Sequence, residues 1–212
     1  MTHFLFDFDG TIGNTMPLCV AAFRDALEPL AHRQIADAEI LATFGPSEDG
    51  TIRALLPDHF EQGLARYFDS FARLHDQWPE PFPGIRGLLD YVKQTESFLG
   101  LVTGRGPRNL AITLTRYGLT DMFQVIKTGR PEGKVKESCI DEIFTAYPLR
   151  REDTIYVGDT AYDIQAAHAC GIRAVAAAWA PTVDLAQLQA AKPDYCFETV
   201  DAFSEAVRNH QL

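Results

Sequence analysis

The feature that most constrains the fold is an alternation of short apolar runs with longer segments of helical periodicity. The runs that have the length of buried strands are His3–Phe8, Phe98–Val102, Phe123–Lys127, Thr154–Val157, Ile172–Ala177 and Tyr195–Phe197. The segments with apolar residues at helical spacing are Ile85–Lys93, Asn109–Tyr117, Glu137–Ala146, Tyr162–Ala169, Asp184–Ala190 and Val200–Asn209. Strands that alternate with helices of this length predict an α/β fold, in which a parallel sheet is covered by helices on both faces.

One long segment interrupts this alternation directly after the first strand. Residues 16–81 contain no convincing strand, but they carry apolar residues at helical spacing, as at Val20, Phe23 and Leu27. The Pro-rich stretch Pro79–Gly84 that follows is typical of a linker. We therefore predict that residues 16–81 form a small helical domain inserted into a core domain made of residues 1–15 and 82–212.

Composition and charge narrow the class of protein. With 212 residues, of which 46% are hydrophobic and 23% charged, the chain is typical of a globular protein. The 29 acidic residues outnumber the 19 Lys and Arg, and the net charge of −10 disfavours binding to nucleic acid or to anionic membranes. The four cysteines form no CxxC pair, no run approaches 18 apolar residues, and residues 1–10 do not resemble a signal peptide. These features predict a cytoplasmic protein with reduced thiols.

Polar residues follow three of the predicted strands at the point where each strand ends. They are Asp7, Asp9 and Gly10 after the first strand, Thr103 and Gly104 after the second, and Asp159 and Asp163 after the fourth. Ligands of open α/β sheets bind beyond the carboxyl ends of the strands. We therefore expect these residues to meet at one edge of the sheet and to form a site.

The pair Asp7 and Asp9 has the spacing of a nucleophile and a general acid. In a continuing strand the two side chains point the same way, and close like charges raise one pKa, so that one carboxyl stays ionised while Asp9 carries a proton. Gly10 and Thr11 then allow the chain to turn away from the strand. The alternative is an Asx-type turn that ends the strand without any catalytic role.

Asp159 and Asp163 are candidate ligands of a divalent cation. Carboxylate oxygens from two strand ends suit Mg²⁺, which prefers hard oxygen ligands. Asp159 could also be the N-cap of a helix that begins near Thr160. Of the five lysines, Lys134 and Lys136 lie where a side chain can reach the same edge of the sheet.

Four segments together resemble the motifs of the haloacid dehalogenase superfamily, in its phosphoglycolate-phosphatase-like branch. The DxDGT motif stands at Asp7–Thr11, an apolar strand that ends in Thr stands at Leu99–Thr103, and GDxxxD stands at Gly158–Asp163. Lys136 begins KESCIDEIF, which is similar to the KxxxI helix start of this branch, although the common Lys-Pro pair is absent. Lys136 is therefore preferred over Lys134.

The resemblance implies a Rossmann-like core with a helical cap inserted after the first motif. It also implies that Asp7 attacks phosphorus to form an aspartyl-phosphate, while Asp9 protonates the leaving alcohol and then activates water. Asp7, the main-chain carbonyl of Asp9 and Asp159 would bind Mg²⁺, with Asp163 in the outer shell. The residues that would hold the phosphoryl oxygens are Thr103, Gly104 and Lys136.

The expected function is thus Mg²⁺-dependent hydrolysis of a small phosphate monoester, with a small phosphorylated metabolite as the partner of a monomer or homodimer. Alternatives with the same core chemistry are a phosphomutase of the β-phosphoglucomutase kind and a pyrophosphatase or nucleotidase. A haloacid dehalogenase needs neither Asp9 nor the GDxxxD pair. A phosphonoacetaldehyde hydrolase needs a lysine in the cap, and no lysine precedes Lys93. A pure binding protein would be expected to lack Asp7 or Asp9.

The choice of substrate depends on the inserted segment. We expect the stretch FGPSEDGTIR to face the site, with Phe44, Gly45, Pro46, Ser47 and Arg53 as candidate contacts. Arg105, beside Thr103 and Gly104, is either a substrate contact or an exposed arginine. Family members often carry an acidic residue shortly after DGT, whereas this chain has Gly13-Asn14-Thr15. No residue of the stretch singles out one phosphate ester.

Overall fold

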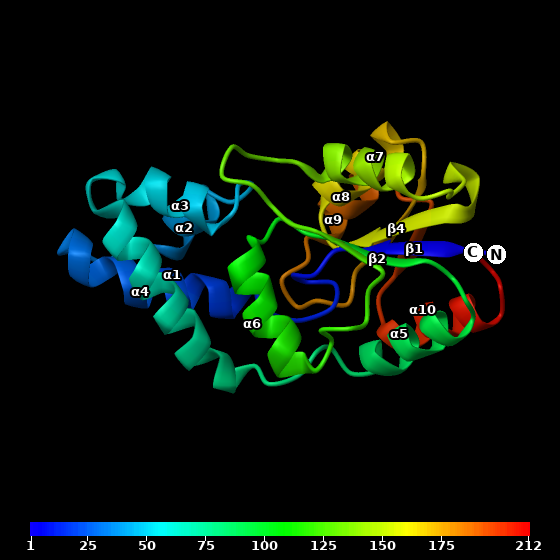
Figure 1. Cartoon of the computed structure of the whole chain (residues 1–212), viewed down its shortest axis with the longest axis horizontal. Helices are drawn as coiled ribbons and strands as arrows, with labels where there is room; N and C mark the ends of the chain where they lie inside the picture. The colour runs from blue at the N-terminus through cyan, green and yellow to red at the C-terminus, as the bar shows by residue number, and fades with distance from the viewer.

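The computed structural model describes residues 1–212 and contains one six-stranded parallel sheet (Figure 1). Its strands are β1 (His3–Phe6), β2 (Leu99–Val102), β3 (Val125–Lys127), β4 (Thr154–Gly158), β5 (Arg173–Ala177) and β6 (Tyr195–Phe197). They are arranged in the order β3-β2-β1-β4-β5-β6, and every neighbouring pair is parallel. The predicted α/β class is confirmed, and each predicted strand matches an observed one.

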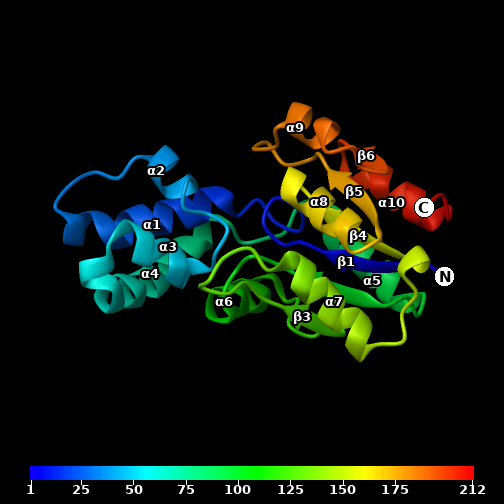
Figure 2. The same ribbon diagram turned by 90° about the horizontal axis from the view of Figure 1, so that it is seen from above.

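Six helices cover the two faces of the sheet. One face is covered by α5 (Ile85–Gln94), α6 (Pro107–Tyr117) and α10 (Val200–Arg208). The opposite face is covered by α7 (Lys136–Ala146), α8 (Ala161–Ala169) and α9 (Leu185–Ala190), and Figures 1 and 2 show the two layers. Each of these helices lies where helical spacing predicts one, with ends that differ by one or two residues.

The first strand shows why its sequence is a continuous apolar run. Phe4 and Phe6 pack into the hydrophobic cluster under α5 and α10, whereas Leu5 packs into the cluster under α7 and α8. Alternate side chains of a strand point to opposite faces, so a strand with helices on both sides must be apolar at every position. This burial fixes β1 in the middle of the sheet.

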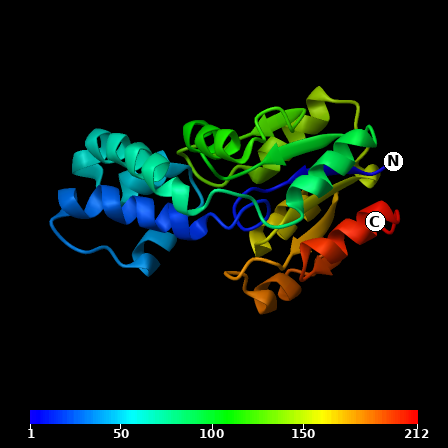
Figure 3. The ribbon, with the colours of Figure 1, turned by 90° about the horizontal axis from the view of Figure 1, so that it is seen from below.

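Residues 16–77 form a group of helices beside the sheet (Figure 3). Its elements are α1 (Met16–Ala31), α2 (Asp37–Leu41), α3 (Glu48–Leu55), α4 (Phe60–Leu74) and the short 3-10 turns Pro57–His59 and His75–Gln77. All 12 buried residues of its hydrophobic cluster, from Leu18 to Phe71, belong to the group itself. The predicted insert requires a helical group with its own hydrophobic core. The domain boundaries at residues 15/16 and 81/82 stay a prediction.

The strand order places the candidate site residues at a crevice. The chain runs outward from β1 through β2 to β3 on one side, and through β4, β5 and β6 on the other. The order therefore reverses beside β1, and ligands of such sheets bind where this reversal occurs. The helical group lies at the carboxyl ends of the strands, whereas the two termini lie together at the opposite end (Figure 1).

Two further sequence expectations can be compared with the structure. All four cysteines are free thiols, and three of them are buried. None of the helices combines the length and the apolar character needed to cross a lipid bilayer.

Candidate active site

A cavity of about 300 Å³ lies between the carboxyl ends of the strands and the helical group of residues 16–77. The predicted site residues that line it are Asp7, Asp9, Gly104, Lys136 and Asp159. Thr103 and Asp163 are buried and do not line the cavity. Segments far apart in the sequence thus converge on one cavity.

Asp7 is joined to the core through a lysine. The Lys136 ammonium donates a hydrogen bond of 2.7 Å to Oδ2 of Asp7, and it also donates one to Oδ1 of Asp163. Lys136 is the first residue of α7, so the start of this helix brings its Nζ under the end of β1. A single buried cation therefore connects Asp7, which follows β1, with Asp163 in the first turn of α8.

Asp7 and Asp159 present oxygen atoms that have no hydrogen-bond partner. Oδ1 of Asp7 and Oδ1 of Asp159 are both buried and unpaired. One carboxylate oxygen from each of Asp7, Asp159 and Asp163 lies within 4.8 Å of the others. Buried polar atoms normally have a partner, and oxygen atoms of this kind suit Mg²⁺. The residues present therefore fit a divalent cation.

Gly10 makes room for the Asp159 carboxylate. A Cβ atom at position 10 would lie 1.9 Å from Oδ2 of Asp159, which is far closer than two non-bonded atoms can approach. The backbone of Gly10 also has a φ of +74°, which favours glycine. The glycine of DxDGT therefore has a physical reason: it permits both the turn after β1 and the close approach of Asp159.

The helix that follows β4 is capped by Thr160. The hydroxyl of Thr160 accepts a hydrogen bond from the Asp163 N–H, and Oδ2 of Asp163 accepts one from the Thr160 N–H at 3.0 Å. This is a capping box, in which cap and third residue satisfy each other. The expectation that Asp159 could be the N-cap is wrong. Because Thr160 serves that role, the Asp159 side chain is left free to face the cavity.

Asp9 is held by a buried arginine. Arg105 donates from its Nε to Oδ2 of Asp9 at 2.8 Å and from its Nη2 to Oδ1 at 2.6 Å. The Thr15 hydroxyl donates a further hydrogen bond to Oδ1. The Arg105 side chain is only 3% exposed, so it is not the exposed arginine that the sequence left open. Both oxygens of Asp9 are therefore engaged on the core side of the cavity.

The two aspartates of the first motif have opposite pKa shifts. Burial raises the pKa of Asp7 to about 7, although the neighbouring Lys136 opposes the shift. Burial would also raise the pKa of Asp9, but the charge and hydrogen bonds of Arg105 hold this pKa below its ordinary value. The expectation that Asp9 carries the proton of the pair is thus wrong for the ligand-free protein, because an arginine from another segment stabilises its charge.

The end of β2 supplies a hydroxyl and a glycine. The Thr103 hydroxyl accepts a hydrogen bond from the Arg105 N–H at 3.3 Å. A Cβ atom at Gly104 would meet nothing within 4 Å, so the backbone there is open toward the cavity. On its other side this turn packs closely against Gly129, where a Cβ atom would lie 1.8 Å from the Gly104 carbonyl oxygen. The turn after β2 is therefore packed against Gly129 on one side and open to the cavity on the other.

The two candidate lysines occupy different places. Lys136 is buried, and the charges of Asp163 and Asp7 outweigh its burial and raise its pKa. Lys134 is exposed at the mouth of the cavity, with its Nζ 4.6 Å from the centre of the Tyr162 ring. Only Lys136 contacts Asp7.

This geometry agrees with comparisons to known proteins. The family model of haloacid dehalogenase-like hydrolases matches residues 4–177, which is most of the chain. The chain belongs to this family. A phosphoglycolate phosphatase from Synechococcus elongatus is 28% identical over 210 residues, which cover 98% of this chain and 97% of that protein. The pyrophosphatase PpaX of Bacillus mycoides is 26% identical over 196 residues, which cover 92% of this chain and 91% of that protein.

A solved structure gives the same result for the fold. The haloacid dehalogenase-like hydrolase SP0104 from Streptococcus pneumoniae aligns with a TM-score of 0.78 at 22% sequence identity, and the alignment covers 98% of each chain. Both the core and the inserted helices are included in this similarity, because almost the whole chain is aligned. The protein therefore has the fold of that structure.

In this hydrolase the second wall of the cavity comes from the inserted helices. Phe44, Gly45 and Pro46 line the cavity as expected. Ser47 is buried but does not line it, and its N–H donates to the Arg130 carbonyl at 3.0 Å. Arg53 was a wrong candidate, because its guanidinium lies over the Phe60 ring, 3.9 Å from the ring centre and outside the cavity.

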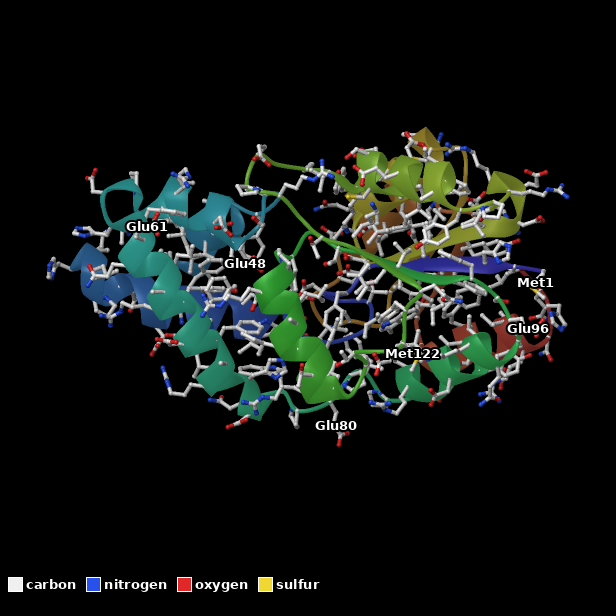
Figure 4. The ribbon with its side chains drawn as sticks, in the orientation of Figure 1. Met1, Glu48, Glu61, Glu80, Glu96 and Met122 are labelled. Atoms are coloured by element: carbon white, nitrogen blue, oxygen red, sulfur yellow. The ribbon has the colours of Figure 1, made fainter.

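Sequence reasoning missed Glu48, which joins the insert to the core. Its Oε2 accepts from the Gly106 N–H at 2.9 Å, and its Oε1 accepts from Nδ2 of Asn109 at 2.8 Å. Figure 4 labels Glu48 on the side of the helical group that lies next to α6. Burial raises the pKa of its carboxyl. The acidic run of FGPSEDGTIR was visible in the sequence, but nothing there indicates a partner 58 residues away.

Proposed function

We propose that this hydrolase is a Mg²⁺-dependent phosphatase, which transfers the phosphoryl group of a small monoester to Asp7 and then to water. The observation that carries the proposal is the state of the Asp7 carboxylate. One of its oxygens is hydrogen-bonded to Lys136, while the other is buried without a partner at a cavity wall. A carboxylate that is fixed on one side and free on the other is suited to attack an electrophile.

The same carboxylates would hold the metal. Asp7 and Asp159 would bind Mg²⁺ together with the main-chain carbonyl of Asp9, and Asp163 would act in the outer shell. The contacts of Asp163 support its placement in the outer shell. Its Oδ1 already accepts a hydrogen bond from the Lys136 ammonium, and its Oδ2 accepts hydrogen bonds from the Thr160 N–H and the Thr160 hydroxyl. When bound, the ion supplies positive charge that offsets the repulsion between these carboxylates and a phosphate dianion.

The remaining residues would bind the phosphoryl group and move protons. Lys136 and the open Gly104 backbone line the cavity and would hold phosphoryl oxygens, where electrostatic positioning dominates catalysis. The Thr103 hydroxyl, which was predicted for the same role, is fully buried behind them and would position this turn. Asp9 would exchange a proton with the leaving oxygen and later with water. Because Arg105 holds Asp9 ionised in the free protein, the step in which Asp9 donates requires a proton taken up after substrate enters.

The helices of residues 16–81 would act as the cap over this site. This role is supported by the cavity, whose wall includes Phe44 and Glu48 opposite the core carboxylates. A cytoplasmic location and action as a monomer or homodimer complete the proposal; they rest on the sequence expectations alone.

The names of the relatives support phosphoryl transfer without selecting one ester. One relative is named a phosphoglycolate phosphatase and another a pyrophosphatase. A phosphomutase of the β-phosphoglucomutase kind would use the same core residues but protect the aspartyl-phosphate from water. Transfer from a sugar bisphosphate to a sugar, with slow phosphate release, would favour the mutase.

A phosphate-release assay tests the proposal. The purified protein is incubated with a panel of monoesters and with pyrophosphate, with Mg²⁺ or with a chelator. We expect release with Mg²⁺, none with chelator, and none from Asp7→Asn with either. Full activity in chelator, or in the Asp7→Asn variant, would show that the proposed mechanism is wrong.

A further inference from the structure

The wall of the cavity that the insert contributes includes three aromatic rings. Phe44, Phe23 and Tyr67 come from three separate segments of the insert and all line the cavity. The Phe23 and Tyr67 rings are stacked with their centres 4.2 Å apart, and the Phe44 ring lies 5.9 Å from that of Phe23. Tyr67 is fully buried and its hydroxyl accepts from Asn109 at 3.0 Å, so its ring cannot turn away. We refer to these three rings as the aromatic wall.

No cation of the insert reaches this wall. The insert contains no lysine, and none of its five arginines lines the cavity. Arg24, Arg33 and Arg73 form ion pairs with acidic residues of the insert itself. Arg53 lies over the Phe60 ring. Arg66 is exposed, so all five arginines are directed away from the cavity.

The insert places a carboxyl group in the cavity wall, and not a cation. Glu48 lines the cavity, and each of its oxygens already accepts a hydrogen bond from the core, so it is not free to accept from a ligand. An anionic group bound against the aromatic wall would therefore lose its hydration and gain no cation of the insert in return.

The cations of the core side are engaged elsewhere. Arg105 is paired with Asp9, and Lys136 lies between Asp7 and Asp163. Lys134 has no carboxylate partner, but it is exposed at the mouth of the cavity and lies over the Tyr162 ring. Lys134 is the one cation that could attract an anionic leaving group to the wall, so the experiment includes a variant at this position.

We infer that the substrate of this hydrolase is a phosphate monoester whose leaving group is an uncharged, apolar alcohol with a body about the size of one ring. The inference rests on the proposed phosphatase function and names its substrate class. The phosphoryl group binds at the core carboxylates, and the apolar body packs on the aromatic wall at the half-buried Phe44 ring, behind which the buried Phe23 and Tyr67 rings are stacked. The volume of about 300 Å³ is at the lower end of small-molecule pockets, which limits that body to roughly a single ring. A second phosphate or a carboxylate on the leaving group is disfavoured.

Two esters that differ by one charge test the inference directly. Benzyl phosphate and 4-carboxybenzyl phosphate have the same leaving oxygen on the same carbon, but only the second carries a carboxylate to the wall. With the full-length protein and Mg²⁺, we expect kcat/KM for benzyl phosphate to be at least about tenfold higher. Equal values, or a preference for the carboxylate, would overturn the inference.

Variants distinguish a role of the aromatic wall in binding the leaving group from a general loss of activity. Phe44→Ala should lower kcat/KM for benzyl phosphate by about tenfold while changing that for ethyl phosphate, which is too short to reach the wall, by less than about twofold. Phe60→Ala, an aromatic residue of the insert outside the cavity, should preserve the ratio between the two esters. An equal loss for benzyl and ethyl phosphate in Phe44→Ala would contradict a role of the wall in binding the leaving group.

The remaining outcomes distinguish the inference from the function on which it rests. Lys134→Met should leave the preference for benzyl over 4-carboxybenzyl phosphate unchanged, and a preference for the carboxylate that disappears in this variant would overturn the inference. If pyrophosphate or phosphoglycolate is hydrolysed at least as efficiently as benzyl phosphate, the inference fails while the phosphatase function stands. If no ester releases phosphate, the proposed function fails and the inference with it.

Discussion

Arg105 and Asp9 form a two-pronged ion pair within the core, with N–O distances of 2.8 and 2.6 Å, although 96 residues separate them in the sequence. The pair connects the turn after β1 with the turn after β2. It fixes the orientation of the Asp9 carboxyl and keeps it ionised in the absence of substrate. Arg105 thereby acts as a positioning residue for the proposed acid and base.

Removal of this guanidinium should affect both stability and turnover. Arg105→Met leaves Asp9 as a largely buried charge without its cation, and the loss of one partner of such a pair costs about 3–5 kcal/mol. We expect a lower free energy of unfolding in urea and a fall in kcat that exceeds the change in KM. The matched control is Arg108→Met, an exposed arginine in the first turn of the helix α6 that follows. A wild-type kcat in Arg105→Met would contradict the positioning role.

Asp159→Asn should remove the response of the protein to Mg²⁺. The wild-type melting temperature should rise with Mg²⁺ concentration, because a ligand of the folded state alone stabilises by about 2.7 kcal/mol at one hundred times its Kd. The variant replaces an unpaired carboxylate oxygen of the acidic cluster with an amide and should show little rise. Asp69→Asn, an exposed aspartate of the insert, should respond like the wild type. Equal shifts in Asp159→Asn and wild type would exclude Asp159 as a ligand.

Gly10→Ala should abolish activity for a steric reason. The added Cβ would lie 1.9 Å from Oδ2 of Asp159 and must displace that carboxylate, and the positive φ adds strain. We expect phosphate release to fall by at least about a hundredfold, since small displacements of catalytic groups have effects of this size. Gly87→Ala, in α5 with nothing within 4 Å, should retain activity and gain up to about 1 kcal/mol of stability. An active Gly10→Ala variant would contradict the tight packing described here.

Glu48→Gln should change how stability depends on pH. Burial raises the pKa of Glu48 in the folded protein, so its contribution to stability is present at low pH and is lost as pH rises through the folded pKa. Glutamine does not titrate, so the melting temperature of the variant relative to the wild type should increase as the pH rises above 4.5, the ordinary pKa of a glutamate (roughly 2–4 °C for each kcal/mol). Glu61→Gln, an exposed glutamate of the insert, provides the control. A difference that falls as pH rises would contradict the direction of this shift.

The sequence predicts the sheet well because each strand is signalled locally. β1 and β4 are apolar at most positions, and Asp7 follows β1 while β4 ends at Gly158, which indicates both their burial and their carboxyl ends. The convergence of Asp7 and Asp159 then follows from the rule for parallel sheets. Lys136 could be chosen over Lys134 only from the resemblance to a family, since both lie within reach of the same edge.

What the sequence does not predict are contacts between distant segments. The pairing of Asp9 with Arg105 reverses the expected order of the two pKa values, and no local pattern indicates it. Glu48 binds the first turn of α6 across the boundary between insert and core. Asp159 is free because Thr160 caps α8, a choice that depends on the detailed backbone turn after β4. In each case the partner is set by tertiary packing rather than by neighbouring residues.

The most direct measurement is the detection of phosphoryl on Asp7 by mass spectrometry. Asp9→Asn should slow hydrolysis of the intermediate, so this variant is mixed with Mg²⁺ and an aryl phosphate, quenched in acid and digested. The account predicts that the peptide containing Asp7 gains the mass of one phosphoryl group, and that Asp7→Asn shows no such gain. Phosphoryl on another residue, or unlabelled protein that still releases phosphate when Asp7 is replaced, would contradict it.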